Sequence, residues 1–136
     1  MKRREFIRII GSGSVISAVA PNYVFADGSL SSDGVLLEAC TFQAPGGWKL
    51  DTQHYHQMGG CYLMAHGMGK PVADAVTDVT IPEAGEWYVF VRTKDWCPGD
   101  WAAPGRFKVA INGNTLDTTF GTQKGWAWQT GGKTRL

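Results

Sequence analysis

The stretch RFKVAINGNTLDTTF, residues 106–120, predicts two short strands joined by a tight turn. Three alternate residues before the turn share one apolar face: Phe107, Val109 and Ile111. Asn112-Gly113 is a strong hairpin signal, because both residue types tolerate the positive φ that two-residue turns need. Three alternate residues continue the apolar face after the turn: Leu116, Thr118 and Phe120. This stretch predicts a β-hairpin with one face in a core.

Other parts of the chain carry the same alternation. Residues 87–93 form the strongest strand candidate, and its two faces differ. One face holds Trp87, Val89 and Val91, and the other holds Tyr88, Phe90 and Arg92. Residues 35–42, 61–66 and 75–81 are further strand candidates, and Trp48 and Trp87 are expected in the core. Short strands and turn signals at this spacing predict an all-β, antiparallel β-sandwich of jelly-roll type over residues 35–136.

The composition agrees with that fold class. The chain has 136 residues, with 18 glycines and six tryptophans, and glycine-rich, aromatic-rich chains favour strands over helices. Its formal net charge is +1; the first 26 residues carry +3, which leaves −2 on the rest. The rest of the chain has no basic stripe of the kind that binds nucleic acid, so we expect no nucleic-acid partner.

The first 26 residues predict an export signal. Basic residues including Arg3 and Arg4 precede an apolar stretch, and Val24-Phe25-Ala26 is a small-residue cleavage site that ends at Ala26. Arg3-Arg4-Glu5-Phe6 fits the twin-arginine pattern, in which Phe6 follows the arginine pair. A nucleotide-binding loop is disfavoured, since Ile16 stands where its third glycine should be.

Further expectations follow from this signal. Residues 27–34 are small and polar and predict a flexible leader, and the protein is expected to be exported, in the periplasm or outside the cell. The apolar stretch is shorter than the roughly 20 residues of a membrane span, so none is expected. In an oxidising compartment one pair among Cys40, Cys61 and Cys97 can form a disulfide, and the alternative is three buried thiols.

An ordered set of motifs resembles the β-sandwich module of exported bacterial FAD-dependent oxidoreductases. The matching motifs lie in residues 35–42, 46–48, 51, 57–59, 62–67, 70–75, 81–85, 91–96, 104–107, 109–113 and 119–122. The chain also resembles jelly-roll carbohydrate-binding modules. The family's glycine-rich FAD loop has no counterpart here, so the resemblance implies a non-catalytic accessory module, with FAD in a longer parent protein and no cofactor in this chain.

The resemblance leaves two partners open, an oxidoreductase catalytic domain or a polysaccharide. The candidate ligand-binding residues are Arg92, Asp95, Trp96, Trp101, Trp126 and Trp128. Exposed tryptophans can stack on sugar rings or dock on a protein domain. The guanidinium of Arg92 can clamp a carboxylate, and the alternative is a surface ion pair.

No catalytic or metal site is expected. His54, His56 and His66 could form a metal set, but no third ligand stands at a spacing that is diagnostic of a metal site. The sequence also shows no nucleophile elbow and no carboxylate pair. An enzyme in its own right is the third and least supported class. Residues 126–136 predict a glycine turn with another strand just beginning, so we expect a fragment of a longer protein whose last strand or strands are missing.

Overall fold

The computed structural model describes residues 6–10, 34–66, 70–81, 83–95 and 105–136, and these are mostly strands with almost no helix. The strands are β1 (Phe6–Ile10), β2 (Trp48–Asp51), β3 (Tyr62–Ala65), β4 (Ala75–Asp78), β5 (Glu86–Thr93), β6 (Lys108–Ile111), β7 (Asn114–Thr115) and β8 (Ala127–Arg135). The helical pieces are the 3-10 turn η1 (Ala39–Thr41) and the single-turn helix α1 (Tyr55–Met58). The all-β prediction is confirmed.

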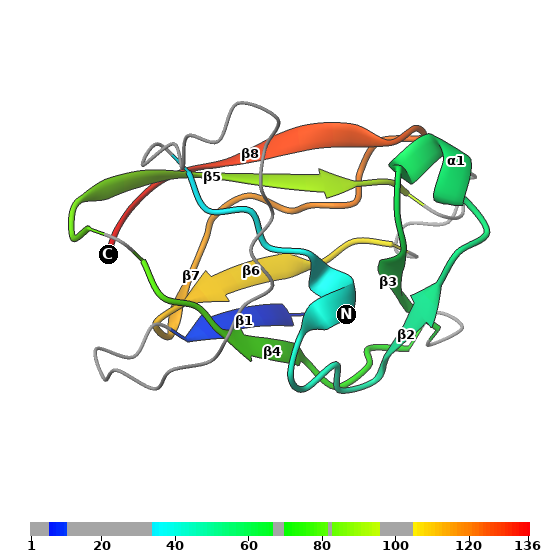
Figure 1. Ribbon diagram of the computed structural model, residues 1–136, viewed down its shortest axis with the longest axis horizontal. Coiled ribbons are helices and arrows are strands. Elements are labelled where there is room, and N and C mark those ends of the chain that lie inside the picture. Colours follow the sequence, from blue (N-terminus) through cyan, green and yellow to red (C-terminus); the bar gives the residue numbers. More distant parts are fainter. Residues whose placement is uncertain (1–5, 11–33, 67–69, 82, 96–104) are drawn as a thin grey trace, which may run out of the picture.

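The strands form three small sheets (Figure 1). One sheet has the order β4-β1-β6-β7, and the others are the antiparallel pairs β2-β3 and β5-β8. The buried core cluster consists of Trp48, Ala75, Phe107, Val109, Ile111, Leu116 and Phe120. Val89 and Val91 of β5 pack against this cluster. The core therefore joins the β5-β8 pair to the four-stranded sheet and to β2.

The hairpin predicted from residues 106–120 is confirmed. β6 pairs antiparallel with β7, and Phe107 forms a further bridge to Phe120. The turn residues Asn112 and Gly113 have φ values of 50° and 80°, as a two-residue hairpin turn requires. The apolar face is buried as expected, with Val109 only 2% exposed and Phe120 0% exposed.

The prediction for the end of the chain is wrong for the described residues. Residues 127–135 do not start a new strand after a glycine turn; they form one long strand, β8, which pairs with β5 along its whole length. Val89 pairs with Gly132 and Phe90 pairs with Thr130, so Gly131 is the extra residue of a β-bulge. Gly132 has φ 81°. The pairing extends to Leu136, which exchanges two backbone hydrogen bonds with Gly85.

The strand predicted over residues 35–42 is also wrong. Residues 34–38 have no regular structure, and the η1 turn follows. The Glu38 carbonyl accepts hydrogen bonds from both the backbone and the side chain of Thr41, so local bonds replace a strand ladder. Val35, Leu36 and Leu37 consequently remain exposed, with Leu36 65% exposed, whereas Phe42 packs against the core.

Strand β1 is the unexpected element of the fold. Phe6–Ile10 belongs to the predicted export signal, yet it lies between β4 and β6 and is parallel to both. The sheet thus departs from the purely antiparallel arrangement expected from the sequence. The signal itself stays a prediction; Arg3, Arg4 and Ala26 and most of the flexible leader lie outside the described residues.

Candidate functional site: an exposed aromatic face

Three aromatic side chains lie exposed on the outer face of the β5-β8 pair. Tyr88 and Phe90 are 61% and 57% exposed on β5, and Trp128 on β8 is 58% exposed. They are outward because side chains alternate along each strand while Val89 and Val91 face the core. We call Tyr88, Phe90 and Trp128 the aromatic face.

The strand register makes the aromatic face continuous. Phe90 pairs with Thr130 and Arg92 pairs with Trp128, so Trp128 is the diagonal neighbour of Phe90. Diagonal neighbours and alternate residues on one strand are about 7 Å apart, within reach of large side chains. Phe90 is therefore the middle member of a stripe that runs from Tyr88 to Trp128.

Charged residues at one end of the stripe are already paired. The Lys133 ammonium lies 5.3 Å from the centre of the Tyr88 ring, a cation–π contact. The same ammonium is 3.2 Å from a carboxylate oxygen of Glu86. Both side chains of this ion pair are exposed, so the pair adds little to stability. Its effect is to neutralise the charge next to the aromatic rings.

Arg92 lies at the other end of the stripe, bound to the backbone. Its Nη1 donates to the carbonyl of Met58 at 2.7 Å, and its Nη2 donates to the carbonyl of Gln57 at 2.8 Å. A cation at the C-terminal end of a helix satisfies carbonyls that lack partners within the helix. Arg92 therefore fastens α1 to β5, a role that neither the predicted carboxylate clamp nor the predicted ion pair describes.

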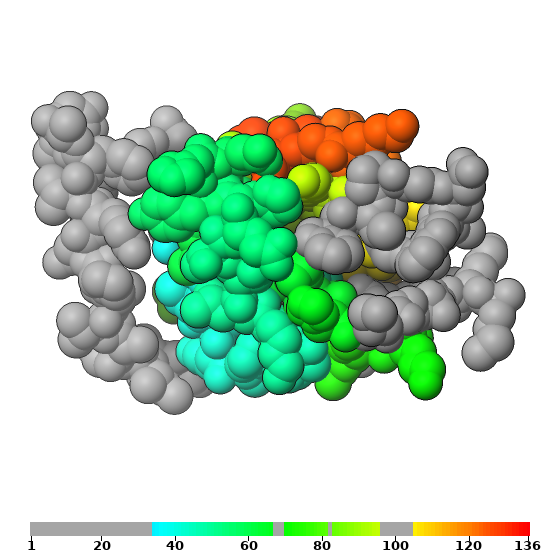
Figure 2. Space-filling view, turned by 90° about the vertical axis from the view of Figure 1, so that its right-hand side faces the viewer, coloured from blue at the N-terminus to red at the C-terminus, as the bar shows by residue number. Residues whose placement is uncertain are grey.

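A polar and aromatic cluster lies near α1, at the end of the molecule that Figure 2 views. The Tyr62 hydroxyl donates to Asp51 and accepts from the backbone N–H of His54 at 3.2 Å. The ring of Trp126 meets the Tyr62 ring edge-on, with centres 4.9 Å apart. His54 Nε2 lies 3.3 Å from the Lys94 ammonium. These contacts hold the loop before α1 against β2 and β3.

The hydrogen bond between Tyr62 and Asp51 changes the pKa of both groups. Partial burial works to raise the pKa of Asp51, but the bond from Tyr62 and two backbone N–H groups outweigh it and lower the pKa. Burial and then the same bond raise the pKa of Tyr62. A carboxyl group with a lowered pKa stabilises the folded state above its unfolded pKa, and that contribution is lost as pH falls through the folded value.

Tyr62→Phe is therefore expected to lower stability most at neutral pH. The variant should lose about 1 kcal/mol of stability there, and its difference from wild type should shrink as the pH falls through the folded pKa of Asp51, where wild type loses the same contribution. Urea unfolding followed by circular dichroism at several pH values measures this difference. The control is Tyr55→Phe, which removes an exposed hydroxyl and should match wild type at every pH. A difference between wild type and Tyr62→Phe that does not change with pH would contradict the assignment.

Two more of the sequence-predicted site residues, Trp126 and Asp95, are described, and both make contacts away from the aromatic face. Trp126 is half-buried in the cluster near α1, and its indole nitrogen is buried with no hydrogen-bond partner in the described part of the chain. The backbone N–H of Asp95 donates to the carbonyl of Gln123 at 2.6 Å. Trp96 and Trp101 lie outside the described residues. Of the two predicted tryptophans that the structure describes, Trp128 lies on the aromatic face and Trp126 does not.

Of the two tryptophans predicted to lie in the core, Trp48 is buried and Trp87 is only half-buried. Trp48 is buried in the core cluster, as expected. Trp87 is half-buried, and its indole N–H donates to the carbonyl of Glu83 at 3.1 Å. Tyr88 and Phe90 were visible in the sequence as the outward side of their strand, but nothing local marked them as a site.

Cys40 and Cys61 are neighbours with free thiols, whereas Cys97 lies outside the described residues. Burial raises the pKa of Cys40 to about 11, helped by the hydrogen bond and charge interaction with Cys61 and by the charge of Glu38. The Cys40 thiol is consequently protonated at neutral pH and is a slow nucleophile.

We expect Cys40 and Cys61 to form a disulfide when the protein is treated with oxidised glutathione. The two thiols lose two protons and two electrons, and glutathione disulfide is reduced to two glutathione molecules. Peptide mapping by mass spectrometry should find Cys40 joined to Cys61 at a rate that increases above pH 8, as more Cys40 thiolate forms. Cys40→Ser is the control. A crosslink that joins Cys97 to either residue instead would contradict the pairing.

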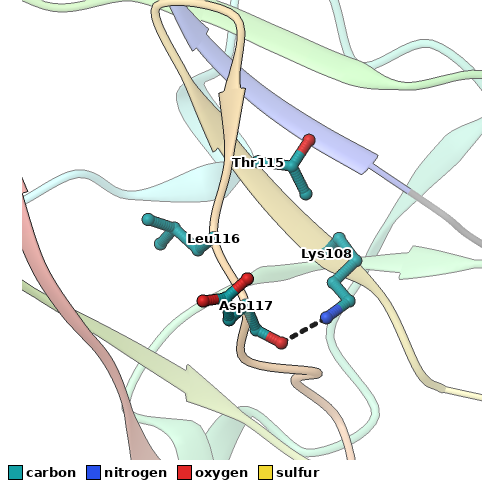
Figure 3. A pocket seen from close by; sticks show the side chains of 4 residues that line it. All are labelled: Lys108, Thr115, Leu116 and Asp117. Carbon is teal, nitrogen blue, oxygen red and sulfur yellow. Dashed lines mark hydrogen bonds between the residues drawn. The ribbon is translucent and has the colours of Figure 1, made fainter.

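A shallow hollow of about 230 Å³ lies beside the hairpin, lined by Lys108, Thr115, Leu116 and Asp117 (Figure 3). Ligand sites usually measure about 300–1,000 Å³. The Lys108 ammonium also donates to the backbone carbonyl of Asp117, so it already has a hydrogen-bond partner within the protein. The hollow is therefore smaller than a usual small-molecule site, and its only lysine is already bound to the protein.

The described ranges hold no group of three or more His, Cys, Asp or Glu residues that is placed to bind a metal ion. Within the same ranges, no helix is both long and apolar enough to cross a membrane. Comparison with known proteins found no matching family model, no similar curated protein and no similar solved structure.

Proposed function

We propose that this protein is a non-catalytic accessory β-sandwich module of jelly-roll type that docks on the catalytic domain of an exported FAD-dependent oxidoreductase. The observation that carries the proposal is the aromatic face, in which three rings lie more than half exposed next to one another. Contiguous exposed apolar surface is uncommon on monomeric proteins and marks interaction sites. Tyrosine and tryptophan are also enriched at protein interfaces.

Binding of a polysaccharide through the same rings is the alternative. Aromatic rings can stack on sugars, but a glycan site also needs polar groups that reach the sugar hydroxyls. The nearest charged groups, Lys133 and Glu86, are engaged with each other and with Tyr88, and Arg92 is bound to carbonyls of α1. An apolar stripe with its charges already satisfied favours a protein partner.

Substitution of the central ring tests the proposal. Phe90→Ala should weaken binding of the full chain to a flavin-containing catalytic domain of the resembled family by about 10-fold or more, equivalent to at least about 1.4 kcal/mol. Titration calorimetry measures the affinity. The matched control is Leu50→Ala, which removes an apolar side chain of similar exposure from β2.

The outcomes separate the two partners. Saturable binding of the domain that Phe90→Ala weakens and Leu50→Ala leaves unchanged supports docking. Binding of an acidic or neutral polysaccharide that Phe90→Ala or Trp128→Ala abolishes, together with no binding of the domain, supports the alternative. Purified protein that carries a flavin and oxidises a substrate would contradict the non-catalytic assignment.

A further inference from the structure

Strand β1 fills a slot between two strands that run in the same direction. Residues Ile7 to Ile10 pair with Ala75 to Asp78 of β4, and residues Phe6 to Ile9 pair with β6. Adjacent strands are about 4.8 Å apart, so removal of β1 would leave β4 and β6 about 9.6 Å apart with the facing backbone groups unpaired. Unpaired backbone groups in a core sheet are costly.

The two walls of the slot are buried. Register position 7 lies between Ala75 and Val109, and register position 9 lies between Thr77 and Ile111. All four wall residues are buried. A strand in this slot therefore lies next to the core, and its positions equivalent to 7 and 9 must be apolar, as Ile7 and Ile9 are in this chain.

The strand that fills the slot comes from the predicted export signal. Cleavage after Ala26 would remove Phe6–Ile10 and with it the centre of the sheet. The predicted twin-arginine motif also includes Phe6, so the same residues serve as signal and as strand. A strand inside a sheet has its backbone groups engaged on both edges, so the segment cannot act as a free signal and as β1 at the same time.

The nearest part of the mature chain is held away from the slot. Residues 35–37 are apolar and exposed, which would suit a replacement strand. However, Ala44 bonds to both the N–H and the C=O of Val76, at 2.7 and 3.0 Å respectively. Those two groups point to the edge of β4 opposite β1, because both groups of one strand residue face the same side. Ala44 thus fixes this part of the chain at the far edge of β4.

We infer that the slot between β4 and β6 is a strand-acceptor site, which Phe6–Ile10 fills before the partner binds and an extended segment of the partner catalytic domain fills afterwards. The identity of this partner rests on the proposed function. The acceptor site recognises a segment of about five residues mainly through backbone hydrogen bonds, which is the mode known as β-strand addition. The segment needs apolar residues at two alternate positions and no proline at a bonded position. Arrival of the partner strand would also release the signal.

The slot can be tested in the full chain with a defined peptide. A protease recognition sequence is placed between Ala26 and Asp27, and the folded chain is purified, cut and separated from the released leader. A fluorescein-labelled peptide of residues 5–11 is then titrated in, and its anisotropy is measured. We expect saturable binding to the cut chain and at least 10-fold weaker binding to the uncut chain, because the tethered strand competes at a millimolar effective concentration.

Matched peptides identify what is recognised. The peptide with Arg8→Pro should not bind, because proline lacks the N–H that position 8 contributes to the ladder, whereas the peptide with Arg8→Val should bind. A Thr-Val repeat of equal length should also bind, since the backbone supplies most of the recognition. If the cut chain loses its β-sheet circular dichroism, the peptide should restore it.

Several results would overturn the inference. Equal binding to cut and uncut chains would place the peptide elsewhere on the protein. A cut chain that stays folded and binds no peptide would mean that another segment, such as residues 35–38, closes the slot. A cut chain that unfolds and is not restored by the peptide would make Phe6–Ile10 an irreplaceable part of the domain. No partner domain is present in these assays, so their result is independent of docking through the aromatic face.

Discussion

Gly121→Ala is expected to lower the free energy of unfolding by at least about 3 kcal/mol. Gly121 has φ 72°, a conformation that alanine rarely adopts. A Cβ atom there would also lie 1.7 Å from the backbone carbonyl oxygen of Gly105. Neither backbone can move easily, because the adjacent Phe107 and Phe120 pair with each other.

Two other glycines separate the causes. Gly113 also has positive φ, but a Cβ there would meet nothing within 4 Å, so Gly113→Ala measures the conformational cost alone, about 1 kcal/mol. Gly125→Ala meets no neighbour, has no positive φ and should be nearly neutral. Urea unfolding of the three variants gives the comparison. If Gly121→Ala cost no more than Gly113→Ala, the close approach of Gly121 to Gly105 would be wrong.

The strands that the sequence predicted correctly are those with uninterrupted alternation. β5 and the hairpin of β6 and β7 carry clear two-residue periods, and Asn112-Gly113 encodes its own turn. β8 was missed because its two adjacent glycines indicate a turn locally, whereas in the fold a bulge against β5 accommodates them. That accommodation depends on a partner strand about 40 residues away, which local pattern does not contain.

The core is covered more fully than a missing last strand would allow. Such a gap would leave Val109 and Phe120 partly uncovered, yet both are fully buried. Val89 and Val91 are partly buried against the same core. β8 passes close to Phe120 and was not predicted as a strand. Residues 27–136 alone are expected to be only marginally stable, because β4 and β6 would lose the strand that pairs with both.

The candidate site depended even more on long-range pairing. Alternation placed Phe90 and Arg92 on the outward side of their strand, and the structure agrees for Phe90. The partners of Arg92 are carbonyls 34 and 35 residues earlier in the chain, so its role in holding α1 could not be inferred from its neighbours. Likewise, Trp128 joins the aromatic face only through the register of β8 against β5.

Phe120→Ala should cost about 3–5 kcal/mol of stability, the second large effect that we expect. The Phe120 side chain is 0% exposed and stacks on Phe107 with ring centres 5.6 Å apart. Its Cζ also lies 3.0 Å from the position that a Cβ of Gly131 would occupy, so the ring fills the space between the hairpin and β8. Truncation would leave a cavity where these two elements meet.

Phe90→Ala is the matched control, because it removes the same side chain from the aromatic face. Phe90 is 57% exposed, so its truncation should change stability by less than about 1 kcal/mol. Thermal and urea unfolding measure both variants, and the docking assay is repeated at a temperature where both are folded. Phe120→Ala should then bind the partner like wild type, whereas Phe90→Ala should not. Equal losses of stability would mean that β5 is turned the other way, with Phe90 in the core, and the aromatic face would not exist.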